Sequence, residues 1–275
     1  MNKKKSAWIR LIVSSITTLA LISVLIVGIY GGNIFSFHWG IGFSSHYADA
    51  DKYQAGNGSI SAGTLKELDI NWISGQVTVL PYSGDTIEIT ETSPESLTEE
   101  TMVHHYYNDG TLYIQYQASI GFSFFHRSPS EKKLEIKIPE ALAAQLEQVS
   151  GDGVSADMSF TGLTTRNLSL DTVSGHLTFD GSVQNIDSDS VSGDCECISR
   201  LSPESVNMDS VSGDQHLQIP EDTSFEADYD TVSGGFTCDF ATTNRGDSVI
   251  CGTGDNEYNF DTVSGDIFLS PVSPE

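Results

Sequence analysis

Apolar and polar residues alternate along most of the chain from residue 65 onward. Leu68, Ile70 and Trp72 are spaced two apart, and Val77 and Val79 continue the pattern. A period of two is typical of strands with one buried face. After residue 100 the segment 140–148 is the one candidate for a short helix. The pattern therefore predicts an all-β fold.

Turn residues divide the region 65–140 into separate strands. The stretch Asn108-Asp109-Gly110 lies between two apolar runs, and Asp-Gly accepts the positive φ angles that tight hairpins need. The alternation over 134–138 ends at Pro139. We therefore expect an N-terminal β region over residues 65–140, which caps one end of the domain.

A six-residue motif recurs through the second half of the chain. It reads Asp-Thr-Val-Ser-Gly-Asp at 261–266, and variants of it precede this copy at fairly regular intervals. A near-constant period of about twenty residues fits one coil of a β-solenoid, with loops absorbing the irregular gaps. We predict a β-solenoid, or β-helix, over residues 141–270. Its corners are expected at the repeat glycines Gly151, Gly175, Gly193, Gly213, Gly234 and Gly265.

The residues around each glycine indicate which side chains point into the coil. Leu177 and Phe179 stand two and four positions after Gly175, and apolar pairs follow most of the other glycines. This spacing places both side chains on one face of a strand. The valine two positions before each glycine breaks that phase, which predicts a bend where glycine adopts backbone angles closed to other residues. The valines expected to stack inside are Val173, Val191, Val211, Val232 and Val263.

Five of the six motifs, all except the one at Gly151, also carry an aspartate four positions before the glycine. Stacked coils would align the carboxylates in a row at a spacing of about 4.8 Å. The row would contain Asp171, Asp189, Asp209, Asp230 and Asp261. Each carboxylate could accept hydrogen bonds from turn amides, or the row could hold divalent cations such as Ca²⁺. We favour the first interpretation, because the calcium-binding nonapeptide of glycine- and aspartate-rich toxins is not matched.

The start of the chain differs from the rest. A basic segment, 1–10, precedes the range 11–30, which carries no charge and is mostly apolar. Twenty helical residues cover a hydrocarbon layer of about 30 Å, so we expect a transmembrane signal anchor; a cleaved signal peptide is the alternative. The positive-inside rule then places the N-terminus in the cytoplasm and the remainder outside the cell membrane. A juxtamembrane linker over 31–64 and a tail over 271–275 complete the organisation.

Charge narrows the choice of partner. All 38 acidic residues follow the anchor, against nine Lys or Arg, so the exported part carries a formal charge of −29. Such a surface repels nucleic acid and anionic lipid, and attracts cations and basic peptides. It also keeps a repetitive β protein soluble. Four cysteines, Cys195, Cys197, Cys238 and Cys251, are too few for a disulfide framework, so we expect small buried residues.

The repeated Asp-[Thr/Ser]-Val-Ser-Gly corners, with the short form Val149-Ser150-Gly151-Asp152, resemble the bacterial putative-adhesin family of β-solenoid domains, a domain of unknown function. The strand ending at Pro139 and the closing motif at 261–267 are similar to that family as well. The resemblance spans 65–270. Its LiaG-like members are membrane-anchored and associated with cell-envelope stress responses in Gram-positive bacteria, which implies a similar setting here. It transfers no catalytic residue.

Three classes of function follow. The first is a non-enzymatic, membrane-anchored extracytoplasmic module that binds a protein, a glycan or a cationic peptide at the cell surface. The second is an accessory regulator of an envelope-stress sensor. The third is a β-helical enzyme acting on polysaccharides, which we disfavour because the carboxylates recur in every repeat, as a structural element would. We predict no catalytic or cofactor-binding residue.

Overall fold

The computed structural model describes residues 50–118, 131–246 and 248–272. The predicted anchor at 11–30 lies outside these residues, and among those described no helix is long and apolar enough to cross a bilayer.

The described chain is almost entirely β-structure. A 3-10 turn, Ala50–Lys52, and a short helix, α2 (Glu140–Ala143), accompany eighteen strands in one hydrogen-bonded network. The strands are β1 (Gln54–Ala55), β2 (Gly58–Ile60), β3 (Glu67–Tyr82), β4 (Ile87–Thr92), β5 (His104–Asn108), β6 (Thr111–Gln115), β7 (Lys133–Pro139), β8 (Leu146–Thr172), β9 (Leu177–Ser190), β10 (Cys195–Ser199), β11 (Ser205–Ser210), β12 (Gln215–Ile219), β13 (Phe225–Thr231), β14 (Phe236–Cys238), β15 (Thr242–Asn244), β16 (Ser248–Cys251), β17 (Asn256–Thr262) and β18 (Ile267–Pro271). The all-β prediction is confirmed.

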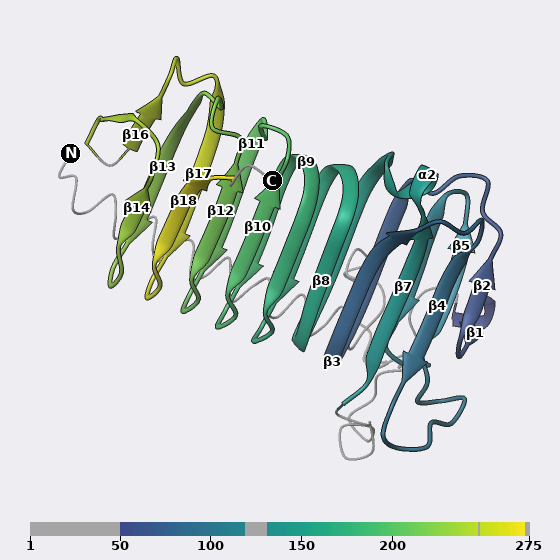
Figure 1. Cartoon of the computed structure of the whole chain (residues 1–275). Coiled ribbons are helices and arrows are strands. Elements are labelled where there is room, and N and C mark those ends of the chain that lie inside the picture. Colours follow the sequence, from purple (N-terminus) through teal and green to yellow (C-terminus); the bar gives the residue numbers. More distant parts are fainter. Residues whose placement is uncertain (1–49, 119–130, 247, 273–275) are drawn as a thin grey trace, which may run out of the picture.

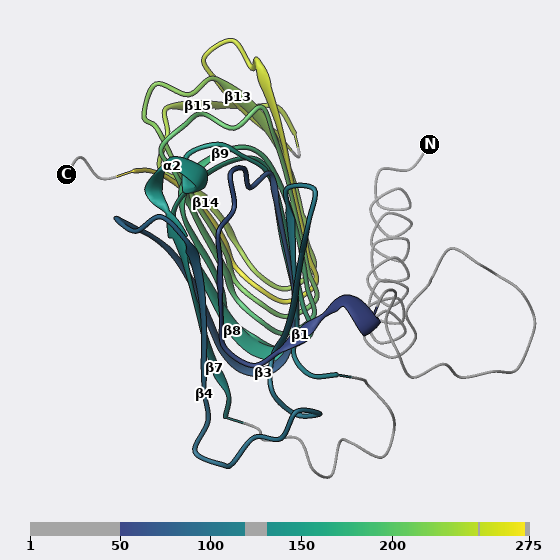
Figure 2. The same cartoon turned by 90° about the vertical axis from the view of Figure 1, so that its right-hand side faces the viewer.

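Each repeat in the second half forms a flattened coil of two strands joined by a tight corner (Figure 1). Strands that precede the corners pair in parallel with one another, as Asp171 does with Asp189. Strands that follow the corners pair likewise, as Leu177 does with Cys195. Figure 2, which looks along the stack, shows the two sets of strands facing each other across the core. The prediction of a solenoid-like stack is confirmed.

The coils do not stack in sequence order. β17 pairs in parallel with β11 on one side and with β13 on the other. The C-terminal coil, β17–β18, therefore lies between two coils made from earlier residues, as the yellow coil between green ones shows in Figure 1. The chain after β14 forms the antiparallel hairpin β15–β16, and β16 pairs with β13. This hairpin occupies part of the long gap between Gly234 and Gly265, which we expected loops to fill.

The N-terminal β region continues the same stack. β3 runs parallel to β8, and its two halves pair in parallel with β6 and β7. The predicted hairpin joins β5 to β6, with φ angles of 48° at Asp109 and 90° at Gly110. β1 and β2 pair with β5 and β4, so β-structure begins at Gln54, within the range 31–64 that we expected to be a linker.

Five of the six predicted corner glycines lie at corners, but for a different reason from the one expected. None of the five has a positive φ angle. Instead, a Cβ atom at Gly193 would lie 1.9 Å from the carbonyl oxygen of Gly175 in the adjacent coil, and the same close approach recurs along the stack. Glycine is needed because neighbouring backbones touch here. Gly151 is the exception, since it pairs with Ile70 inside β8, and Ala156 contacts the next corner instead.

Candidate functional site at the corner edge

The corner motif turns its threonine or serine, and not its valine, into the core. Thr172 and Ser190 are each 3% exposed. Oγ1 of Thr172 accepts a hydrogen bond from the Gly175 amide at 2.9 Å, and Oγ of Ser190 donates one to the Gly193 carbonyl at 2.8 Å. The hydroxyl group closes the corner from within, and these bonds meet its need for a partner in the core.

The valines point outward, so the prediction that they stack inside is wrong. Val232 is 61% exposed, and the other four are partly exposed. The strand alternation continues through Asp (out), Thr or Ser (in) and Val (out), and its phase breaks only between Val and Ser. The coils stay in register here, because the Ser192 amide donates to the Val173 carbonyl at 2.9 Å and the Ser212 amide to the Val191 carbonyl at 2.8 Å.

The aspartates that precede the corners lie in one row, which we call the aspartate row. Asp171 pairs with Asp189, and Asp209 pairs with both Asp189 and Asp261. Asp230 pairs with Asp261 at one end. At the other end Asp152, which the repeat alignment had not included, forms a side-chain hydrogen bond with Asp171. The members in spatial order are Asp152, Asp171, Asp189, Asp209, Asp261 and Asp230.

Crowding in the row changes the acidity of its carboxyl groups. Partial burial, followed by repulsion from neighbouring carboxylates, raises the pKa of Asp189 and of Asp209 to about 7. Burial and mutual repulsion also raise the pKa of Asp152 and of Asp171, which are hydrogen-bonded to each other. Two carboxyl groups can share a hydrogen bond only when one is protonated. The row therefore holds protons close to neutral pH.

The aspartate that follows the corner glycine has a different role. Oδ1 of Asp194 accepts the Asp214 amide at 2.9 Å, and Oδ1 of Asp214 accepts the Asp266 amide at 2.8 Å. Oδ1 of Asp266 accepts the Gly235 amide at 2.7 Å. We call Asp194, Asp214 and Asp266 the amide-binding column. Each of these bonds links one coil to the next. In the aspartate row the Asp171 carboxyl likewise forms a hydrogen bond with the backbone of Asp189, as we expected of that row.

The described residues contain no group of three His, Cys, Asp or Glu side chains that could hold a metal ion. Each coil contributes one carboxyl group to the row, whereas Ca²⁺ takes about six to eight oxygen ligands. Cation binding by Asp171, Asp189, Asp209, Asp230 and Asp261 stays a prediction.

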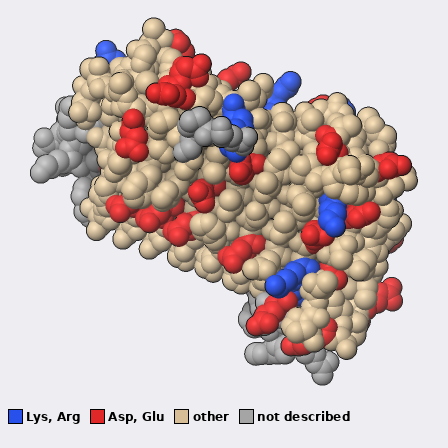
Figure 3. All heavy atoms as spheres, viewed as in Figure 1, with Lys and Arg blue, Asp and Glu red and all other residues tan. Residues whose placement is uncertain are grey.

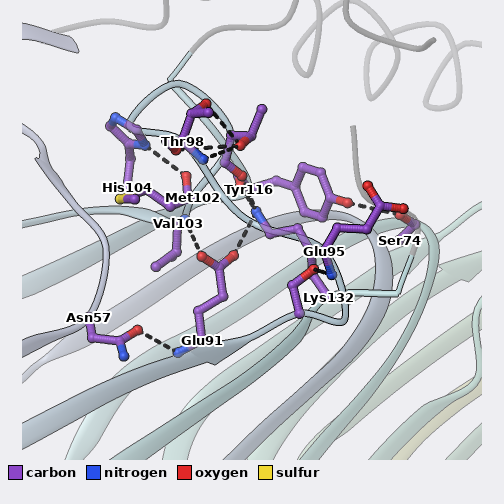
Figure 4. A network of polar contacts seen from close by, with 12 residues as sticks. Asn57, Ser74, Glu91, Glu95, Thr98, Met102, Val103, His104, Tyr116 and Lys132 are labelled. Atoms are coloured by element: carbon purple, nitrogen blue, oxygen red, sulfur yellow. Dashed lines mark hydrogen bonds and ion pairs between the residues drawn. The ribbon is translucent and has the colours of Figure 1, made fainter. Parts of the chain in front are cut away.

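A second polar cluster is buried in the N-terminal half, and no motif in the sequence marks it (Figure 4). Nζ of Lys132 lies 2.6 Å from Oε1 of Glu91, and both side chains are at most 1% exposed. The other Glu91 oxygen accepts the Val103 amide at 2.8 Å. Lys132 also donates to the Thr101 carbonyl at 2.7 Å and to that of Tyr116, whose ring centroid lies 3.9 Å from Nζ. The ammonium group thus joins segments that are distant in sequence.

The histidines of β5 belong to the same half of the molecule and are buried. His104 is 7% exposed and His105 is 3% exposed. Nδ1 of His104 lies 3.0 Å from the Met102 carbonyl, and the His105 ring packs against Gly58. Burial is the main cause that lowers the pKa of both imidazoles. Their surroundings are those of packing residues and give no support for catalysis.

The cysteines are free thiols, with Cys195 and Cys197 buried and Cys238 and Cys251 partly buried. This agrees with the expectation of small buried residues for the first pair.

Solved structures of several bacterial proteins are similar to this chain. The chain is similar to a putative cell adhesion protein from Clostridium sporogenes, with a TM-score of 0.50 and 10% identity over 80% of this chain and 100% of that one. A putative adhesin from Bacteroides fragilis matches with a TM-score of 0.40 and 12% identity, over 80% and 97% of the two chains. A putative lipid binding protein from Parabacteroides distasonis matches with a TM-score of 0.38 and 14% identity, over 79% and 96%. At these identities the likeness supports the fold alone.

Sequence comparison gives the family. No curated protein matches the chain. The family model described as Toastrack DUF4097 matches twice, over residues 65–197 and 143–270, and the two matches together cover both halves of the stack. This chain therefore belongs to the Toastrack DUF4097 family, whose domain has no established function, and the expected resemblance to the putative-adhesin family is confirmed.

Proposed function

We propose that this protein is a membrane-anchored surface module that binds a partner outside the cell membrane and catalyses no reaction. A basic segment followed by the uncharged range 11–30 supports the anchor. The acidic remainder, with its formal charge of −29 from 38 acidic residues and nine Lys or Arg, suits a soluble extracytoplasmic domain.

The observation that carries the proposal is the register of the stack. Adjacent coils align like residues in straight outer columns, as Asp189, Asp209 and Asp261 show. Columns that repeat at the strand spacing of about 4.8 Å form a stiff, ordered surface. Such a surface loses little conformational entropy when it binds an extended partner. The likeness to adhesion proteins agrees with this function at the level of fold.

The orientation is tested in intact cells that express the full chain with an N-terminal and a C-terminal epitope. Added protease should remove the C-terminal epitope and leave the N-terminal one, and lysis should expose both. Protection of the C-terminal epitope in intact cells would show that the domain faces the cytoplasm and would end the proposal.

The partner class is tested by recovering the full chain from membranes in mild detergent after cross-linking. Surface protein, glycan or cationic peptide among the recovered molecules supports the binding module. Recovery of a membrane-embedded sensor as the main partner would favour an accessory regulator of a stress-sensing system instead.

A further inference from the structure

The corner edge of the stack carries a continuous outer column of branched aliphatic side chains. Ile73 pairs in register beside Val154, and the Ser174 amide donates to the Val154 carbonyl, which places Val173 next. The Ser264 amide donates to the Val211 carbonyl, and the Ser233 amide to that of Val263. The members in spatial order are Ile73, Val154, Val173, Val191, Val211, Val263 and Val232, and we call them the valine column. All seven are partly or fully exposed.

Carboxylates flank the valine column along most of its length on one side and beside its central coils on the other. The aspartate row stands two residues before it, on the same outer face, because alternate residues of a strand point the same way. The amide-binding column of Asp194, Asp214 and Asp266 stands three residues after it and is largely exposed. Neither the valine column nor the acidic columns contain a Lys or Arg. Figure 3 shows acidic side chains following the lower left edge, where Figure 1 places the corners, with no basic side chain among them.

An apolar stripe with acidic residues beside it is complementary to a partner that has an apolar side flanked by basic residues. Seven rungs at about 4.8 Å give a stripe about 29 Å long. A helix of about 19 residues has this length, and its apolar residues recur at about 5 Å intervals along one side, close to the spacing of the rungs. Basic residues beside that apolar side would face the two acidic columns. A partner with scattered charge and no apolar stripe would leave the valines in water.

From this complementarity we propose that the valine column and the two acidic columns form a docking surface for a cationic amphipathic helix of a partner. This inference rests on the proposed function, since it names the partner class of that surface module. The occupant is cationic because the docking surface and the whole exported part are acidic, and a second copy of this chain would bring like charge against like.

The test measures binding of a synthetic helix of 19 residues, built from Leu and Lys with the leucines on one side, to the full chain in detergent micelles at pH 8, where most carboxyls of the aspartate row are ionised. Two controls share its length: a peptide of the same composition in scrambled order, and one with Glu in place of Lys. We expect the cationic amphipathic helix to bind at least tenfold more tightly than either control, and its affinity to fall as salt rises.

Variants of the corner edge and of the opposite edge test where on the protein the helix binds. Val191→Thr with Val211→Thr keeps the branched shape and the strand propensity but removes apolar surface, and should weaken binding by about tenfold. Asp189→Asn with Asp209→Asn should weaken it and reduce its salt dependence. Matched controls lie in turns at the other edge of the coils: Leu201→Thr removes an apolar group that is more exposed than either valine, and Glu221→Gln with Asp222→Asn removes two charges. Both controls should bind like the parent chain.

Equal binding by the parent and both corner variants would overturn the inference, as would equal binding of the scrambled helix. If the valine variants abolish self-association and no helix binds, the column is a contact between copies and the inference is wrong. Failure here is distinct from failure of the proposed function, because the epitope and cross-linking experiments would still report a surface module with a different docking face.

Discussion

Replacing a central member of the aspartate row by asparagine should stabilise the protein near neutral pH. Asp209 lies between Asp189 and Asp261. The pKa of Asp209 is raised from its usual 3.8 to about 7, by burial first and by these neighbours second. A group whose pKa is higher in the folded state gives its full stabilisation below the unfolded pKa of about 3.9 and loses it as pH rises through the folded value. At pH 8 the row is therefore under electrostatic strain.

The size of the effect follows from the shift. A rise from 3.8 to about 7 corresponds to about 4 kcal/mol if the carboxyl were fully shielded from water. Asp209 is partly exposed, so screening reduces this, and we expect Asp209→Asn to gain about 1–2 kcal/mol at pH 8. For a chain of this size that is a rise in Tm of about 3–6 °C. The gain should shrink to about a third of this at pH 5, where the folded carboxyl is protonated but the unfolded one is already ionised, and it should approach zero only below the unfolded pKa of about 3.9.

The assay is thermal unfolding of the full chain followed by tryptophan fluorescence, since Trp72 is fully buried. Burial lowers the pKa of the imidazoles of His104 and His105. The folded protein therefore loses stability as pH falls below about 6.5, the pKa of an unfolded histidine. We therefore compare the Tm difference between variant and parent at pH 5 and pH 8, in which the histidine contribution cancels.

The matched control is Asp214→Asn, which removes one charge from the amide-binding column and keeps an oxygen that can accept the Asp266 amide. If Asp214→Asn raises Tm at pH 8 as much as Asp209→Asn, the gain reflects net charge alone. A gain from Asp209→Asn that is the same at both pH values would refute the reasoning about protonation.

Other predictions concern packing. Glu91→Gln leaves the buried Lys132 ammonium without its ion pair and should cost about 3–5 kcal/mol in urea unfolding; a cost below 1 kcal/mol would show that the pair is solvated. Gly193→Ala places a Cβ 1.9 Å from the Gly175 carbonyl oxygen and should destabilise by more than about 2 kcal/mol, whereas Gly63→Ala, with no atom within 4 Å, should change little; equal effects would contradict the backbone contact. Cys195 and Cys197 are buried, which raises the pKa of both thiols, so in the native protein iodoacetamide should modify Cys251 and spare this pair; mass spectrometry reports the sites, and modification of Cys195 at the rate of Cys251 would show an open core.

The repeat predicted the stack of coils well, because alternation and a regular period are local signals. Leu177 and Phe179 point inward as their spacing requires. The corner differs from the prediction, since the apolar valine points outward and Thr172 is buried. A residue's hydrophobicity does not report its direction when a hydroxyl group can bond to the backbone of the corner and remain inside.

Features that depend on distant contacts could not be predicted from the repeat. β17 lies between β11 and β13 through direct parallel pairing with both, and nothing in the motif at 261–266 marks it as an inner coil. Glu91 and Lys132 are 41 residues apart and carry no motif. The aspartate row was visible in the sequence, but the raised pKa of its members depends on burial that only the stacked coils create.

The most direct test of a docking surface at the corner edge is photo-cross-linking from that edge in intact cells. A benzophenone amino acid at Ser212, an exposed residue beside Val211, is compared with one at Glu221, an exposed residue of the opposite turn. We predict an extracytoplasmic partner cross-linked from position 212 and not from position 221. Cross-linking from position 221 alone, or to cytoplasmic proteins from either position, would contradict it.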